Sequence, residues 1–246
     1  MSAKSQSSWF WLIFSGLILL VAPAFSSLKK LVPMSQMVIG YSVQKRPIEA
    51  FVLGKGAVTV LFLGVFHGDE PQGKEIILKL AHYLQNRADL LEQKRIILVP
   101  VVNPDGLVQN KRTNAHGVDL NRNFPTKDWQ KRALRPRYHP GPHPLSEPET
   151  KVVVNLLKKW SPQRIVSLHA PLHCVNYDGP AKELAFKMAR LNHYPVRSEI
   201  GYPTPGSFGR FCAERGIPLI TLELAKTTTP KAWQQNQRAL ILAIRE

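Results

Sequence analysis

Short runs of consecutive hydrophobic residues alternate along this chain with longer segments whose hydrophobic positions recur every three or four residues. The short runs span residues 58–65, 96–102, 164–168 and 219–224. Continuous runs of this length, rich in β-branched side chains, are typical of strands buried on both faces of a sheet. We therefore predict a strand at each of these positions.

The segments between the runs predict helices. Residues 71–91 carry a helical stripe of hydrophobic side chains from Ile76 to Leu84. Residues 146–149 (Ser-Glu-Pro-Glu) match a capping box with proline in the first turn, and they predict a helix that reaches Trp160. The two remaining predicted helices span residues 181–191 and 230–245.

This alternation predicts an α/β fold with a mixed, largely parallel central sheet flanked by helices. In such sheets, functional residues gather at the carboxyl ends of the strands. His67, Asn103, His169 and Glu223 all lie at or near the predicted strand ends. We expect these four side chains to share one site.

The first 27 residues form a separate module. Lys4 precedes an apolar run at residues 9–21, and Ala-Pro-Ala at residues 22–24 suits cleavage by a signal peptidase. We interpret residues 1–27 as a signal peptide or signal anchor and residues 28–246 as a single catalytic domain. This predicts an exported protein, periplasmic or membrane-anchored. If the segment is not cleaved, the lysines at positions 29 and 30 favour the opposite orientation in the membrane. The domain would then lie on the cytoplasmic face of the inner membrane.

The formal net charge is +16, from 33 Lys and Arg against 17 Asp and Glu. Such a charge favours anionic partners. The basic residues are spread along the chain, without zinc-finger spacing or aromatic–basic alternation. We therefore expect a solvated basic surface and no nucleic-acid partner, and the oligomeric state stays open. The two cysteines, Cys174 and Cys212, either form a disulfide after export or remain buried thiols.

The segment His67-Gly-Asp-Glu70, together with His169, offers three ligands of the types that zinc prefers. Three protein ligands leave a fourth position for water, as in catalytic zinc sites. The structural alternative is that His67 and Glu70 cap the following helix while His169 is a core histidine. His173 is a rival third ligand. Glu223, late in an apolar run, is a candidate proton shuttle.

A long polar loop at residues 111–125 holds two arginines, Arg112 and Arg122. A loop of this length in a small domain needs a functional reason. Arginine suits bidentate carboxylate binding and the stabilisation of an oxyanion. For Asp119 in the same loop, we favour the simpler interpretation that its carboxylate satisfies backbone groups of the loop.

Five sequence motifs together resemble the zinc metallocarboxypeptidases of peptidase family M14. In chain order they are His67-x-x-Glu70, Asn103-Pro-Asp-Gly106, Val118-Asp-Leu-Asn-Arg-Asn-Phe124, His169 and Thr221-Leu-Glu223. Within the family, residues 111–125 and 201–209 are most similar to a short bacterial branch of murein peptide amidases. The resemblance implies a metallocarboxypeptidase-like fold.

The resemblance also implies a role for each site residue. His67, Glu70 and His169 would bind one zinc ion per chain. Arg112 would polarise the scissile carbonyl, and Glu223 would move the proton. Asn121 and Arg122 would contact the substrate's free carboxylate. Tyr202 aligns to within one residue of the tyrosine that closes over the substrate in typical family members, and it would contact the same end of the substrate.

The branch implies a murein-derived peptide as substrate, cut at the γ-D-glutamyl–meso-diaminopimelate bond. One alternative is a metallocarboxypeptidase for ordinary peptides, and another is a non-catalytic basic binding module. Two positions depart from the family pattern. Asp69 replaces the usual arginine between the first two ligands, and Phe208 lies near the side-chain pocket position without a clear acidic determinant.

Overall fold

The computed structural model describes residues 31–133 and 135–246. The predicted signal segment, residues 1–27, lies outside the described residues. Within the described part of the chain, none of the helices combines the length and hydrophobicity that a membrane crossing requires.

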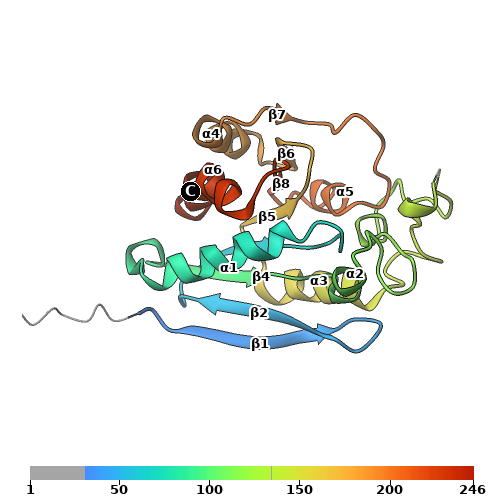
Figure 1. Cartoon of the computed structure of the whole chain (residues 1–246), viewed down its shortest axis with the longest axis horizontal. Coiled ribbons are helices and arrows are strands. Elements are labelled where there is room, and N and C mark those ends of the chain that lie inside the picture. Colours follow the sequence, from blue (N-terminus) through green and yellow to red (C-terminus); the bar gives the residue numbers. More distant parts are fainter. Residues whose placement is uncertain (1–30, 134) are drawn as a thin grey trace, which may run out of the picture.

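An eight-stranded sheet forms the centre of the fold (Figure 1). Its strand order is β1-β2-β4-β3-β5-β8-β6-β7. The four middle strands, β4, β3, β5 and β8, run parallel to one another, whereas β2 and β6 run antiparallel to their neighbours on this block. The strands are β1 (Met34–Tyr41), β2 (Pro47–Leu53), β3 (Val58–Leu63), β4 (Lys94–Val99), β5 (Arg164–His169), β6 (Cys174–Asp178), β7 (Val196–Arg197) and β8 (Leu219–Glu223). The predicted mixed, largely parallel sheet is confirmed.

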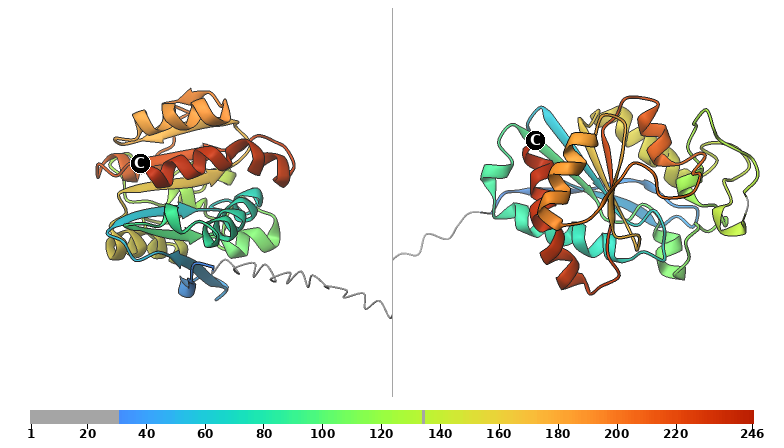
Figure 2. Two further views of the ribbon diagram at one scale, coloured as in Figure 1. Left: turned by 90° about the vertical axis from the view of Figure 1, so that its left-hand side faces the viewer. Right: turned by 90° about the horizontal axis from the view of Figure 1, so that it is seen from above.

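Helices cover both faces of the sheet (Figure 2). Helices α1, α4 and α6 pack on one face, and α3 and α5 pack on the other. The helices are α1 (Gln72–Gln85), α2 (Pro104–Gln109), α3 (Pro148–Trp160), α4 (Lys182–Asn192), α5 (Phe208–Ala213) and α6 (Thr229–Arg245). Short 3-10 turns lie at Ala88–Leu90, Leu120–Arg122 and Pro136–Tyr138.

The continuous apolar runs divide between two hydrophobic cores. Along β3, Phe62 packs beneath α1 and α6, while its neighbours Leu61 and Leu63 point to the core beneath α3 and α5. Successive side chains of a strand point to opposite faces, so a strand covered on both faces is apolar at most successive positions. This continuous apolar pattern explains why β3, β4, β5 and β8 could be predicted from the sequence.

Several predicted boundaries and one predicted cap differ from the structure. Strand β4 ends at Val99 rather than at residue 102, because Pro100 has no N–H to continue the ladder. The capping box at residues 146–149 is not formed. Asn123 donates to the Ser146 hydroxyl, which in turn donates to Glu147, and the helix begins at Pro148 without a side-chain cap.

The antiparallel β1–β2 hairpin and the short strands β6 and β7 were not predicted. The hairpin lies at one edge of the sheet, and among the residues of its two strands only Ile48, Ala50 and Leu53 are buried. An edge strand of this kind alternates irregularly between polar and apolar residues, so its signal in the sequence is weak.

Candidate metal centre

Three neighbouring strands bring the predicted site residues together. His67 follows β3, His169 is the last residue of β5, and Glu223 is the last residue of β8. His169 and Glu223 are directly paired in the β5–β8 ladder. Because these strands are adjacent and parallel, their carboxyl ends meet at one edge, as predicted for these three residues. Asn103, the fourth residue expected in the site, is instead fully buried and is not among the residues that line the cleft.

The turn that carries His67 is fixed by contacts with the segment after β4. The Asn103 backbone N–H donates to the Val65 carbonyl, and the Asn103 side-chain amide donates to the Phe66 carbonyl. Val65 has a φ of 48°, an unfavourable conformation for a β-branched residue. A side chain at Gly68 would overlap the backbone of Gly106. The turn is therefore held in a strained shape that presents His67 and Glu70 on the same side.

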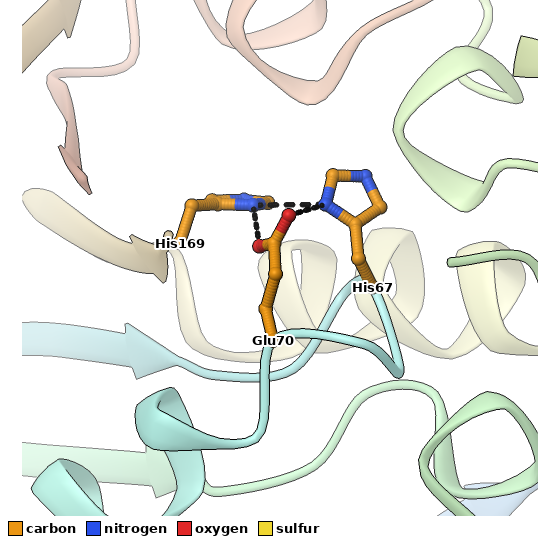
Figure 3. Close-up of side chains that lie close together, drawn as sticks. All are labelled: His67, Glu70 and His169. Atoms are coloured by element: carbon orange, nitrogen blue, oxygen red, sulfur yellow. Dashed lines mark hydrogen bonds and ion pairs between the residues drawn. The ribbon is translucent and has the colours of Figure 1, made fainter. Parts of the chain in front are cut away.

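His67, Glu70 and His169 converge on one point (Figure 3). The two Nδ1 atoms are 3.2 Å apart, and the Glu70 oxygens lie 2.8 Å from Nδ1 of His67 and 3.0 Å from Nδ1 of His169. Ligands of a tetrahedral zinc with bonds of about 2.1 Å are separated by about 3.4 Å. The donor types and their spacing therefore fit a zinc ion. The capping alternative for His67 and Glu70 is wrong, because α1 has no side-chain cap.

His67 and His169 are buried, and Glu70 is nearly so. Burial disfavours charge on His67, but the Glu70 and Asp119 carboxylates outweigh it and raise the pKa of this imidazole to about 9. Burial also opposes ionisation of Glu70, yet His67 and His169 hold its pKa well below the ordinary value. The site is thus built to keep an ionised carboxylate out of water and to attract a cation to it.

Asp119 has a larger role than the sequence suggested. Its buried carboxylate does accept a hydrogen bond from the Asn121 backbone, as expected for a loop cap. It also accepts from Nε2 of His67 at 3.2 Å and from Nε of Arg112 at 2.9 Å. The preferred interpretation was therefore incomplete. An acidic residue between two apolar residues, Val118 and Leu120, was the available signal that the carboxylate is buried.

Arg112 and Arg122 face the same cleft as the metal ligands. The guanidinium of each lies over the ring of Tyr138, at 5.2 Å and 5.3 Å from its centroid. Asn121, which also lines the cleft, accepts a hydrogen bond from the Phe208 backbone at 2.8 Å. Sequence reasoning missed Tyr138, although it lies in the arginine-rich segment 135–138. Cation–π contacts of this kind restrict where the two guanidinium groups can point.

Glu223 and Tyr202 both line this cleft, whose volume is about 1020 Å³. Glu223 is buried and accepts a hydrogen bond from the Leu172 backbone at 3.3 Å, and burial raises the pKa of its carboxyl. A raised pKa suits a group that must both take up and release a proton near neutral pH. Tyr202 is 42% exposed and stacks on Tyr138 at 6.2 Å between ring centroids.

The remaining candidates lie outside the cluster. His173 packs edge-on against Tyr194 at 4.2 Å and is not among the three converging ligands. Cys174 and Cys212 are buried free thiols rather than a disulfide. Asp69 lines the cleft at its rim, with its carboxylate 3.9 Å from the Arg137 guanidinium.

Comparisons with known proteins agree with this geometry. A family model described as zinc carboxypeptidase matches residues 28–229. Murein peptide amidase A of Escherichia coli (strain K12) is 33% identical over 196 residues, 75% of this chain and 78% of that protein. Gamma-D-glutamyl-L-diamino acid endopeptidase 1 of Lysinibacillus sphaericus is 26% identical over 244 aligned residues, 78% of this chain and 61% of that protein.

Among solved structures, the murein-tripeptide amidase of Escherichia coli O157 matches with a TM-score of 0.66 and 27% identity, covering 89% of this chain and 94% of that one. This confirms the predicted metallocarboxypeptidase-like fold. The sequence match, the fold and the converging ligands agree. The chain is a hydrolytic enzyme that belongs to the zinc carboxypeptidase family, M14.

Proposed function

We propose that this enzyme hydrolyses the amide bond between γ-D-glutamate and meso-diaminopimelate in murein peptides, with one zinc ion per chain. The observation that carries the proposal is a single cleft that holds the three-ligand cluster, the buried Glu223 and two arginines. The names of the relatives support the murein substrate.

His67, Glu70 and His169 would hold the zinc ion. When bound, zinc lowers the pKa of a water molecule toward about 7 and polarises a carbonyl oxygen. Glu223, which lines the same cleft, takes a proton from the attacking water and delivers it to the departing amine. Asp119 keeps Nδ1 of His67 directed at the metal by accepting the hydrogen of Nε2, which is a common arrangement around zinc.

The positive side of the cleft orients the substrate. Arg112 lies 3.7 Å from a Glu70 oxygen, close enough to the metal ligands to stabilise the oxyanion of the scissile carbonyl. Asn121 and Arg122 bind the free carboxylate next to the scissile bond. Tyr202, partly exposed at the rim, covers the bound substrate.

An alternative function is a metallocarboxypeptidase that acts on ordinary peptides. The carboxylate-binding residues Asn121 and Arg122 are compatible with either substrate, because any peptide with a free C-terminal carboxylate could bind to them. A non-catalytic binding module is not supported, because the metal ligands, Glu223 and Arg112 are all present and share one cleft.

We further propose that the enzyme acts outside the cytoplasm, periplasmic or held at the membrane by residues 1–27. The apolar run and the small-residue motif in that segment support export. In cell fractionation, the full chain should appear in the periplasm or membrane, and a chain lacking residues 1–27 should stay in the cytoplasm. Recovery of the full chain from the soluble cytoplasm would contradict export, and protease treatment of spheroplasts would identify a domain on the cytoplasmic face.

Glu223→Gln should lower kcat by about 100- to 10,000-fold, because the amide cannot move the proton. Zinc content, measured by atomic emission, should remain that of the wild type. His169→Ala serves as the contrasting variant, since it should lose the metal as well as the activity. A Glu223→Gln enzyme with a near-normal rate would remove Glu223 from the mechanism.

Asp119→Ala should weaken zinc binding by about 10- to 100-fold, because His67 loses the partner that orients its ring. Competition with a chelator measures the zinc affinity, and circular dichroism checks that the variant folds. Asp119→Asn, which keeps an acceptor, should have an intermediate effect. Asp89→Ala, at an exposed carboxylate, is the matched control. Unchanged zinc affinity in folded Asp119→Ala would show that Asp119 does not position the ligand.

The substrate assignment is tested by mass spectrometry of the products from defined peptides. The zinc-loaded enzyme should release meso-diaminopimelate from L-Ala-γ-D-Glu-meso-diaminopimelate, and a chelator should abolish the release. Acyl dipeptides with basic, apolar or acidic C-terminal residues test the carboxypeptidase alternative. Cleavage of these dipeptides, with no release of diaminopimelate, would reject the murein assignment in favour of the alternative.

A further inference from the structure

The cleft contains a carboxylate that the steps above do not use. Asp178 is the last residue of β6, and its side chain is half-buried in the cleft wall. Burial raises the pKa of this carboxyl to about 6, against the opposing effect of Arg210. Among the described residues, no hydrogen bond or ion pair reaches its oxygens. A carboxylate that lacks such partners inside a substrate cleft is complementary to a cationic ligand.

The sheet register places Asp178 on the same face as Glu223. Across the antiparallel β6–β8 ladder, Cys174 lies opposite Glu223, Asn176 opposite Thr221, and Asp178 opposite Leu219. Directly opposed residues share a face, and so do alternate residues of one strand. Asp178 is four residues beyond the position opposite Glu223, and at about 3.4 Å per residue it lies about 14 Å further along β6. Asn176 and Thr221 line the cleft between the two carboxylates.

The start of α5 joins Asp178 to the proposed carboxylate-binding residues. Asn121 accepts a hydrogen bond from the Phe208 backbone, and the next residue, Gly209, lies against the Asp178 carboxylate. A side chain at position 209 would overlap the carboxylate oxygens. The wall from Asn121 to Asp178 is thus continuous. It would face the side chain of the substrate residue whose free carboxylate Asn121 and Arg122 bind.

Arg210 supplies a positive charge beside Asp178. Its Nε lies 3.4 Å from the Asp128 carboxylate, which holds the side chain at the rim, and 59% of the side chain is exposed. Arg210 lines the same cleft and is the charged group that acts on the Asp178 carboxyl. The other unassigned acidic groups of the cleft are less suitable. Asp69 lies near Arg137, and Glu199 is exposed on the loop before Tyr202.

We propose that Asp178 binds the distal ammonium group of the substrate's diamino acid and that Arg210 binds its distal carboxylate. This pair of opposite charges matches the end of the diaminopimelate side chain, where an ammonium and a carboxylate share one carbon. A substrate with lysine at this position would pair its ammonium group with Asp178 and would leave Arg210 without a carboxylate partner. The inference rests on the proposed function, because it concerns the substrate residue that is released from that same site. It makes Asp178 and Arg210 the determinants of specificity for the side chain of this residue.

Four peptides that differ only in the residue after L-Ala-γ-D-Glu test the proposal. These residues are meso-diaminopimelate with both distal charges, L-lysine with the ammonium, 2-aminopimelate with the carboxylate, and norleucine with neither. Asp178→Asn should lower kcat/KM by about 10- to 100-fold for the two ammonium-bearing peptides, the worth of a hydrogen bond to a charged group. For the other two peptides, the change should stay below about threefold.

Arg210→Gln should show the complementary pattern, with losses only for the two peptides that carry the distal carboxylate. Asp89→Asn and Arg190→Gln make the same chemical changes at exposed positions outside the cleft, and they should leave all four rates unchanged. Asparagine is expected to be tolerated at position 178, because burial already favours the neutral form of this carboxyl. The exposed Arg210 provides an independent test if Asp178→Asn folds poorly.

The outcomes separate this inference from the function on which it rests. A wild-type enzyme that cleaves none of the four peptides with zinc restored would reject the proposed function. A wild-type enzyme that cleaves the diaminopimelate peptide, with Asp178→Asn reducing all four rates equally or none, would reject only the role of Asp178. Equal wild-type rates for the lysine and norleucine peptides would also reject recognition of the ammonium group.

Discussion

Buried charged groups at the carboxyl ends of β3, β5 and β8 impose the main constraint on this fold. Glu70 and Asp119 are held out of water on either side of the His67 ring. Keeping a buried carboxylate ionised is costly unless it is paired and hydrogen-bonded. Both imidazoles and the Arg112 guanidinium provide that pairing here, and a divalent cation among the three converging ligand atoms would complete it.

The sheet supplies the rigidity that this constraint requires. Four parallel strands are apolar on both faces, so two cores fix the strand ends from either side. The strained turn at Val65 persists because Asn103 holds it from the neighbouring loop. A site built in this way keeps its geometry without relying on the metal alone, which is how pre-organised catalytic sites reduce reorganisation during the reaction.

The charge within the cleft is not uniform. Arg112, Arg122 and Arg137 surround Tyr138 on one side, while Glu223 and Asp178 lie along the β6–β8 face. A substrate with a free carboxylate next to the scissile bond and an ammonium group at the far end of its side chain has one favourable orientation in such a field. The overall charge of +16 does not describe this division, because it is an average over the whole surface.

The central strands, the α/β class and the candidate ligands could all be predicted from the sequence. The candidate site residues identified in this way were His67, Glu70, His169, Glu223 and Arg112. Hydrophobic periodicity is a local property, and the spacing of the motifs carries the chemistry of the residues within them. The contacts of Asp119, Tyr138 and Asp178, the free state of the two cysteines and the position of the β1–β2 hairpin become visible only in the folded chain. Each of these depends on contacts between segments that are distant in the chain, such as the pairing of Asp119 with His67, and no local pattern specifies such a contact.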